Sequence, residues 1–460
     1  MPRLPGSSPM KPWLGICLAA LLIIPALGGA AETGDRADPP ETHGVVRAPL
    51  PGPNPRWLFT APTRKNQNGR ASSLLVLTAD GKFHIPLLGG QSAKKDLLWE
   101  RNPIPSDLTV EVPPADLGGG RLAGPGRDGF FVIVNTQARE WRFVGPSVPL
   151  SHLSRPVGLA RGAAAAVGQD GSILLFQDSE NGWHETHRIA PGSADLPSAA
   201  LGDALLMAAD LDGDGRKELI VPAAPSGRYR HGVLGDAIEP TEIRVFRLEG
   251  DKLRLLAFFP AGGDGVFEAL GALAADLDGD GREEILITRS DSAGGAAHLV
   301  LALRDGKPVV KARGWPTGSG GRWSHLLGAF DVDRSGLKVL AVETPHLAGS
   351  LLALRMLPGE LRVRARRSGF TTHTIGSRNL WQFALLRRGG LTEVVLQERS
   401  RNRLAALALV GNRWLLRWTL PLSSPVLSNI VSGDFDGDGR EDLALADAGG
   451  RLLFLLSSWR

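Results

Sequence analysis

The chain has 460 residues with a formal net charge of +4, and 43% of its residues are hydrophobic. This length and apolar content suffice for a large folded domain. A nucleic-acid-binding protein carries a much larger, clustered excess of Lys and Arg, so the charge argues against nucleic acid as a partner. The single cysteine, Cys17, excludes a disulfide framework.

Residues 1–31 have the pattern of a secretory signal peptide. Arg3 and Lys11 give a positive start, residues 14–27 form an apolar run, and residues 29–31 offer a small-residue cleavage site. The run is short for a membrane span of about 20 residues and a proline interrupts it, which favours cleavage over a membrane anchor. We expect a secreted or periplasmic protein of a bacterial envelope, without a transmembrane segment in the mature chain.

Two further regions follow the predicted signal peptide. Residues 32–55 are rich in proline and poor in large apolar side chains, which predicts a disordered leader. Over residues 56–460, short apolar runs alternate with Gly, Pro and Asp-Gly turns, and no helical periodicity is sustained. The sequence therefore predicts an all-β domain over 56–460.

Three nine-residue stretches of this domain are nearly identical. Each starts with Asp-x-Asp-Gly-Asp-Gly-Arg and ends in an acid at position 9. Carboxylates at positions 1, 3, 5 and 9 repel one another without a cation, and oxygen ligands on a tight glycine turn suit Ca²⁺. The carbonyl oxygen of position 7 can add another ligand. The predicted metal residues are Asp210, Asp212, Asp214, Arg216 and Glu218; Asp276, Asp278, Asp280, Arg282 and Glu284; and Asp434, Asp436, Asp438, Arg440 and Asp442.

These loops differ from an EF-hand in two ways. An EF-hand requires a bidentate Glu at position 12 and a helix on each side. Position 12 here is Val221, Ile287 or Leu445, and the flanking apolar runs have the length of strands. The predicted unit is therefore strand, calcium loop, strand.

The motif Asp-x-Asp-Gly-Asp-Gly-x-x-Asp/Glu before an apolar strand resembles the FG-GAP repeat, also called VCBS. The resemblance is strong from Leu201 to the C-terminus and faint before it. It implies the calcium-binding blades of integrin-α-like β-propellers and of exported bacterial proteins. It implies neither a ligand nor an activity, because a fold does not determine a function.

The spacing of the loops predicts the blades. Loop starts at Asp210, Asp276, Asp331 and Asp434, with an emptied copy at Leu385, give a repeat of blade length. The copy at 331 keeps Asp331 and Asp333 but has lost the acids at positions 5 and 9. We therefore expect about three Ca²⁺ sites and weak or no binding at that copy.

Each clear unit has four apolar runs, which we name strands A to D. In the unit from Glu268, runs at 270–275, 284–288, 298–303 and 308–312 alternate with the metal loop and an Asp-Gly hairpin turn. This predicts a β-propeller of seven or eight four-stranded blades with calcium loops between strands A and B. The last unit lacks strand D, and we expect residues 45–50 or the strand near Trp57 to complete it.

In such a meander the loops that join B to C and D to A lie opposite the calcium loops. Arg and aromatic side chains together favour a binding surface, and the family resemblance also places the ligand on this face. For the tryptophans, including Trp381, packing between blades is the alternative. The candidates for the ligand face are Arg228, Tyr229, Arg230, His231, Trp315, Arg322, Trp323, His373 and Arg378.

We therefore expect an exported, calcium-stabilised propeller that acts as a non-catalytic binding or assembly module for a protein or glycan. The repeated, oxygen-rich loops favour a structural over a catalytic metal, and no familiar catalytic motif occurs in the sequence. The alternative is a polysaccharide-active lyase or hydrolase on the same scaffold. It requires carboxylates that converge on the loop face, where the nearby acids, interpreted as ordinary surface residues, are Asp236, Glu239, Asp264 and Glu268.

Overall fold

The computed structural model describes residues 45–50, 54–62, 72–89, 96–388 and 390–456. The predicted signal peptide (1–31) lies outside these ranges. The described residues belong to one compact unit, Ala37–Arg460. They form strands, turns and loops without a helix.

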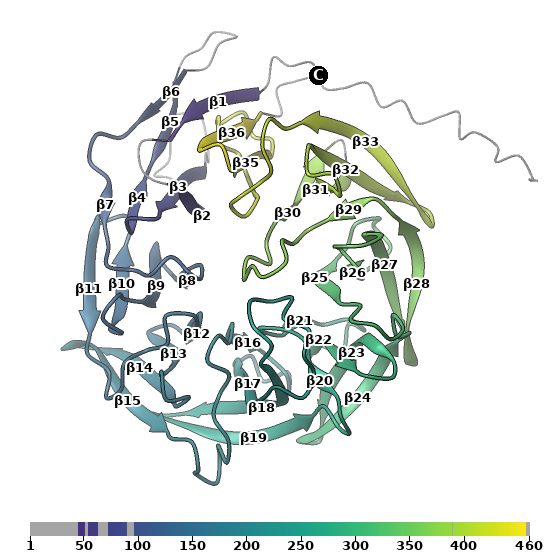
Figure 1. Cartoon of the computed structure of the whole chain (residues 1–460). Coiled ribbons are helices and arrows are strands. Elements are labelled where there is room, and N and C mark those ends of the chain that lie inside the picture. The colour runs from purple at the N-terminus through teal and green to yellow at the C-terminus, as the bar shows by residue number, and fades with distance from the viewer. Residues whose placement is uncertain (1–44, 51–53, 63–71, 90–95, 389, 457–460) are drawn as a thin grey trace, which may run out of the picture. The chain divides into compact units, whose positions relative to one another are not determined.

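Antiparallel pairing groups the described strands into eight consecutive four-stranded sets, which we number as blades 1 to 8 (Figure 1). Within seven of the sets, spatial order follows sequence order, as in the meander of a propeller blade, and in the last set β1 from the other end of the chain follows β36. The chain is therefore an all-β propeller, as predicted.

Blades 1 to 4 lie in the N-terminal half of the unit, and a hairpin of β5 (Pro86–Gly89) and β6 (Asp96–Trp99) is inserted in blade 1. Their strands are β2 (Pro55–Pro62), β3 (Ser72–Thr78), β4 (Lys82–His84) and β7 (Ile104–Pro105); β8 (Ala115–Gly118), β9 (Arg121–Pro125), β10 (Phe131–Asn135) and β11 (Glu140–Val144); β12 (Val157–Ala160), β13 (Ala163–Val167), β14 (Ile173–Ser179) and β15 (Gly182–Ile189); and β16 (Met207–Ala209), β17 (Glu218–Ser226), β18 (Glu239–Glu249) and β19 (Lys252–Pro260).

In blades 5 and 7 the first strand is split into two segments, both of which pair with the second strand. The strands of blades 5 to 8 are β20 (Val266–Phe267), β21 (Leu273–Ala275), β22 (Glu284–Asp291), β23 (Gly295–Arg304) and β24 (Lys307–Gly314); β25 (Ser324–Phe330), β26 (Lys338–Glu343), β27 (Ser350–Leu357) and β28 (Gly359–Arg367); β29 (Phe370–Thr371), β30 (Phe383–Arg388), β31 (Leu391–Glu398), β32 (Arg403–Val410) and β33 (Arg413–Pro421); and β34 (Val431–Gly433), β35 (Asp442–Ala446), β36 (Arg451–Leu455) and β1 (Val45–Pro49).

Strand β1 completes the last blade from the other end of the chain. It runs antiparallel to β36, with Val45 opposite Leu455 and Pro49 opposite Arg451. This confirms the predicted closure by residues 45–50. It also corrects the domain boundary, because β1 lies within residues 32–55 and belongs to the propeller rather than to a leader. Its pairing covers an edge of β36 that would otherwise be open to another chain.

The apolar cores lie between neighbouring blades. Alternate residues of a strand point to opposite faces of its sheet, so each blade packs against both neighbours. One cluster joins the first and last blades, through Leu58 and Val76 of blade 1 and Ala444 and Phe454 of blade 8. The described blades therefore close through core packing as well as through β1.

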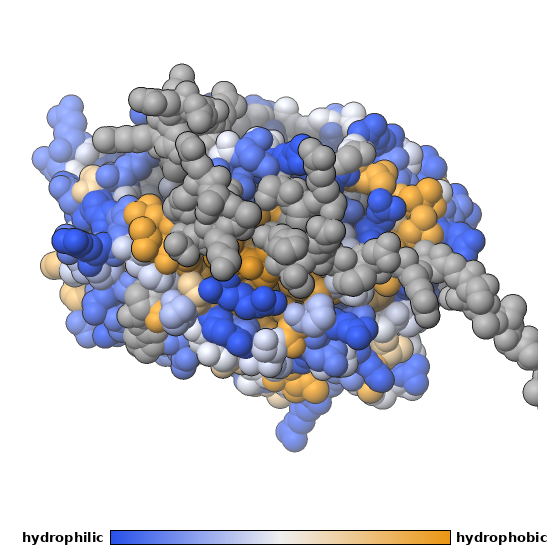
Figure 2. Space-filling model, turned by 90° about the horizontal axis from the view of Figure 1, so that it is seen from above, coloured by the Kyte–Doolittle hydropathy of each residue, from blue (hydrophilic) through white to orange (hydrophobic). Residues whose placement is uncertain are grey.

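Local turn chemistry sets the outer hairpins. Arg304 lies opposite Lys307 across β23 and β24, and the two residues between them, Asp305 and Gly306, have φ angles of 52° and 71°. A two-residue turn with positive φ at both positions is type I′, which the Asp-Gly pair favours. The outer strand β33 buries Trp414, Trp418 and Leu420 and exposes Arg413 and Arg417, and on the side seen in Figure 2 hydrophobic and hydrophilic residues are interspersed.

Candidate metal centres and the opposite loop face

The three acidic loops join the first and second strands of blades 4, 5 and 8, and all have the same fold. In the first loop, the two carboxylate oxygens of Asp210 accept hydrogen bonds from the backbone of Gly213 and Gly215, both at 2.8 Å. These glycines have φ angles of 78° and 82°, a region that side chains disfavour. Asp276 and Asp434 make the equivalent pairs of bonds in the other two loops.

The acid at position 9 is buried beneath each loop. Glu218, Glu284 and Asp442 are at most 1% exposed. Each accepts a hydrogen bond from the backbone N–H of position 2, at 2.9, 2.8 and 2.9 Å respectively. Burial raises the pKa of Glu218 and of Glu284, because the charged form is poorly solvated there. A bound cation would favour the ionised carboxylates.

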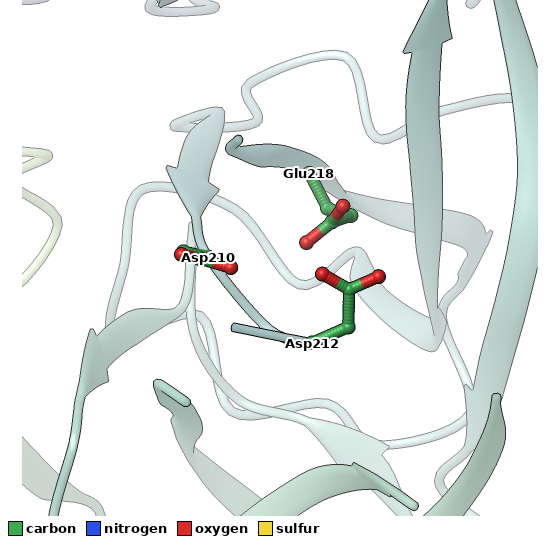
Figure 3. A group of neighbouring side chains, drawn as sticks. All are labelled: Asp210, Asp212 and Glu218. Carbon is green, nitrogen blue, oxygen red and sulfur yellow. The ribbon is translucent and has the colours of Figure 1, made fainter. Parts of the chain in front are cut away.

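The acids at positions 1, 3 and 9 form a carboxylate triad in each of the three loops. Within each triad, one oxygen per residue lies within 4.8 Å of the others. In Figure 3, the carboxylates of Asp212 and Glu218 face each other, with Asp210 beside them. Only oxygen atoms converge, which is the donor set of a hard cation. The triads are Asp210, Asp212 and Glu218; Asp276, Asp278 and Glu284; and Asp434, Asp436 and Asp442.

The acid at position 5 lies outside the triads. Asp214, Asp280 and Asp438 are exposed, and each accepts a hydrogen bond from the backbone N–H of position 7, at 2.8 to 2.9 Å. These residues therefore shape the turn. The side chains at position 7 are also exposed; these residues are Arg216, Arg282 and Arg440.

Basic side chains from the third strand of blade 4 and the fourth strand of blade 5 contact the first two triads. Arg247 of β18 pairs with Asp212, and its Nε lies 3.3 Å from Oε1 of Glu218. The Nζ of Lys311 in β24 lies 2.7 Å from Oδ2 of Asp278, and it also pairs with Glu284. Both triads thus lie next to a cation supplied by the chain.

In the degenerate loop at 331–339, a buried lysine of the loop itself contacts the acid of position 3. This residue, Lys338, is 5% exposed, and its ammonium group donates to Oδ1 of Asp333 at 3.0 Å, to Oγ of Ser335 at 2.9 Å and to the carbonyl of Gly336 at 2.8 Å. Asp331 is exposed. The amine satisfies the carboxylate that a metal would otherwise bind, which gives a physical reason for the loss of the acids at positions 5 and 9.

The nine residues expected on the ligand face differ in how far their side chains are exposed to solvent. Arg228, Arg230, Trp315 and Arg322 are exposed, and Trp315 is 78% exposed. Tyr229, His231 and Arg378 are half-buried, whereas Trp323 and His373 are buried.

Several members of this set tie loops together instead of pointing outward. The Nε1 of Trp323 donates to the carbonyl of Glu268 at 3.0 Å, and His231 pairs with the Glu268 carboxylate. That hydrogen bond raises the pKa of His231. The rings of Trp323 and His373 meet edge to face at 4.9 Å. Packing between loops is therefore the role that the contacts show for these residues.

Arg378 links three parts of the loop face. Its Nε lies 2.9 Å from Oδ2 of Asp203, and its Nη2 lies 2.9 Å from Oδ2 of Asp236. The neighbouring Gly376 donates its backbone N–H to the carbonyl of Val233 at 2.9 Å. The loop after β17 and the loop after β29 are thus held against each other.

Two acids interpreted from sequence as surface residues are buried. Glu239 is 2% exposed and Glu268 is 0% exposed, because the interlocked loops cover them. Burial, and then the nearby charge of Glu268, raise the pKa of Glu239 to about 9. Burial and the same charge raise the pKa of Tyr229 to about 12. The other two, Asp236 and Asp264, are at the surface.

Several further residues at this face were not among the candidates predicted from sequence. Asp203 pairs with Arg378, and His346 contacts His373, with Nε2 and Nδ1 3.1 Å apart. His325 stacks on Trp323 at a ring distance of 5.0 Å. No local spacing marks Asp203 and His346, because their partners Arg378 and His373 lie on another blade.

Comparison with known proteins gives no family assignment. No protein-family model and no curated protein matches this sequence. The solved structures similar to this chain include the Dos1 propeller, with 11% identity, TM-score 0.49 and coverage of 87% of this chain and 94% of that one. They also include BamB from Moraxella catarrhalis, with 10% identity, TM-score 0.44 and coverage of 88% and 98%. At these scores neither structure carries an argument about function. In the part of the chain that the structure describes, no helix is long and apolar enough to cross a membrane.

Proposed function

We propose that this protein is an exported, calcium-stabilised β-propeller of the FG-GAP/VCBS type that acts as a binding or assembly module for a protein or glycan. The observation that carries the proposal is the repeated triad: three loops with the same hydrogen bonds, each placing an acid of position 9 beneath two others. Equivalent, oxygen-only sites between strands favour a structural cation over a catalytic one.

In this proposal the triads hold Ca²⁺ through their carboxylates. Asp214, Asp280 and Asp438, together with the carbonyl oxygens of position 7, complete the shell. The ion supplies a charge that joins the first strand of a blade to its second. In blades 4 and 5 the ion competes with Arg247 and Lys311 for the same oxygens.

The ligand in this proposal meets the loop face through its exposed members. Trp315 is 78% exposed, and Arg228, Arg230 and Arg322 are exposed as well. Exposed Trp and Arg side chains on one face suit a protein surface or a sugar ring. Export to the periplasm or the cell exterior follows from the predicted signal peptide at 1–31.

The buried pair of Glu239 and Glu268 supports a second candidate, a polysaccharide-active enzyme. A carboxylic acid that stays protonated at neutral pH, next to another carboxylate, suits general acid–base chemistry. Reducing-sugar release from acidic and neutral polysaccharides tests this candidate. Activity that is lost in Glu268→Gln but kept in Glu249→Gln would favour the enzyme.

Thermal unfolding with Ca²⁺ and with chelator tests the main proposal. At about 100 times its Kd, each Ca²⁺ ion adds about 2.7 kcal/mol, so a melting temperature several degrees higher is expected with Ca²⁺. The combined change Asp212→Asn, Asp278→Asn and Asp436→Asn should abolish the shift, whereas Asp331→Asn in the degenerate loop should leave it intact. A wild-type protein that melts at the same temperature with and without chelator would contradict calcium stabilisation.

A further inference from the structure

A cavity of about 320 Å³ lies among the first strands of consecutive blades. These strands are the inner ones of their blades (Figure 1). The lining from β12, β16, β21, β25 and β30 is mostly apolar and includes Val157, Met207, Leu273, Leu326 and Phe383, with His325 of β25 as its polar member. This size and lining are within the range of small-molecule sites.

The loop face covers one side of this cavity. Leu205 and Trp323 line the cavity and also belong to an apolar cluster with Val233 and Leu234 of the loop after β17. Leu380 and Trp381 pack against the same cluster and line the cavity too. The cavity therefore has a fixed wall, built from loops that Arg378 holds together.

Arg155 brings an unbalanced positive charge to this apolar wall. Its Nε is buried and has no hydrogen-bond partner. Within the described ranges its guanidinium forms no ion pair, and its Cζ lies 5.9 Å from the centre of the Trp381 ring. Four other buried or half-buried arginines pair with carboxylates, namely Arg244, Arg247, Arg289 and Arg378. The half-buried Arg401 instead donates hydrogen bonds to Thr374 and to the carbonyl of His373.

No carboxylate in the cavity lining is available to balance this charge. The lining contains Glu268, whose two oxygens are engaged by His231 and Ser290. Burial lowers the pKa of Arg155, and the charge of Asp116 opposes this effect without an ion pair. An unpaired guanidinium in an apolar site costs free energy that an anionic ligand would recover.

We propose that this cavity binds a small organic anion, with its carboxylate or phosphate on Arg155 beside Trp381 and its apolar body against the inner strands. The planar fork of Arg matches either anion with two parallel hydrogen bonds. The site is independent of the calcium triads, which use other residues.

Isothermal titration with four probes of the same chain length tests this site: decanoate, decyl phosphate, decanol and decylammonium. We expect the wild-type protein to bind one or both anions and to bind decanol at least about tenfold more weakly, because a charge-assisted hydrogen bond is lost. Preference between decanoate and decyl phosphate identifies the anion. Equal binding of decanol and both anions, or no binding of either anion, would overturn the proposal.

Arg155→Met is the informative variant because it keeps the length of the side chain and removes the charge. It should lower the affinity for the preferred anion at least about tenfold and leave decanol binding unchanged. Its melting temperature should equal or exceed that of the wild type, since an unpaired charge is removed. Arg161→Met, at an exposed position nearby, is the matched control and should bind as the wild type does. Unchanged anion affinity in Arg155→Met would refute the assignment.

Discussion

Arg378 and Asp203 are separated by 175 positions in the sequence, and their side chains meet at 2.9 Å. The Asp203 side chain is 6% exposed, and burial raises its pKa. Arg378 also reaches Asp236, so one guanidinium holds loops from different blades in contact. The loop face is thereby organised by ion pairs between blades. The hydrogen bonds that shape each calcium loop lie within its own blade, and the first loop is also joined to the second by hydrogen bonds between Asp210 and Glu283.

Loss of this link should destabilise the loop face. Arg378→Ala leaves the buried Asp203 carboxylate unpaired, and we expect a loss of about 3 kcal/mol in urea unfolding, with faster hydrogen exchange in the loop after β17. Arg362→Ala is the control: Arg362 pairs with Glu360 in a solvent-exposed setting, so its loss should change the free energy of unfolding far less than Arg378→Ala does. Equal losses in both variants would contradict a special role for Arg378.

Glu239 should make the protein less stable at alkaline pH. Its folded pKa of about 9 lies above the unfolded value near 4.5, so the folded state holds the proton more tightly. This contribution to stability is complete below about pH 4.5 and is lost as the pH rises towards 9. Glu239→Gln should therefore raise the melting temperature relative to the wild type at pH 8.5 but not at pH 5. Glu249→Gln, on the exposed end of the same strand, should show no such pH dependence.

Lys338 should stabilise the degenerate loop without a metal. Lys338→Met removes the ammonium group and leaves the Asp333 carboxylate with one partner fewer, which should cost about 2–4 kcal/mol at any calcium concentration. Adding Asp333→Asn should recover part of the loss, because the remaining charge is then also removed. A Lys338→Met protein that is as stable as the wild type would show that the amine is dispensable.

Lys311 should weaken calcium binding at the second triad. Its ammonium group contacts Asp278 and Glu284, so Lys311→Met should raise the Ca²⁺ affinity of this site about tenfold in titration calorimetry. Lys307→Met, exposed at the start of the same strand, is the control and should leave the affinity unchanged. A lower affinity in Lys311→Met would indicate that Lys311 supports the ion instead of competing with it.

Strand β1 should be required for closure of the propeller. Ala48 is 8% exposed, whereas its neighbour Arg47 is exposed. Ala48→Asp places a carboxylate in the core between blades 8 and 1 and should cost about 2–4 kcal/mol, with larger species in size-exclusion chromatography as the edge of β36 opens. Arg47→Asp introduces the same residue on the outer side and should remain monodisperse with a nearly unchanged melting temperature.

The sequence alone determined the features that depend on neighbouring residues. The spacing of acids at positions 1, 3, 5 and 9 and of Gly at position 6 predicted carboxylates that converge in each loop. The structure brings those of positions 1, 3 and 9 together and leaves position 5 outside, because such a turn is set by local φ angles and local hydrogen bonds. The Asp305-Gly306 hairpin and the all-β fold follow from local patterns as well. The missing last strand was visible as an incomplete repeat, and β1 supplies it.

Only the tertiary structure decided which loop residues point outward and which are tied together. In the folded protein Glu239 and Glu268 are buried, and Arg378 pairs with Asp203. Arg155 has no counter-ion among the described residues and lies in an apolar wall. A bulge also occurs in the last strand pair of blades 3 to 7, which the apolar runs did not indicate. Most of these contacts join residues that lie far apart in the sequence. Their geometry depends on how several blades pack at once, which periodicity within one blade does not encode.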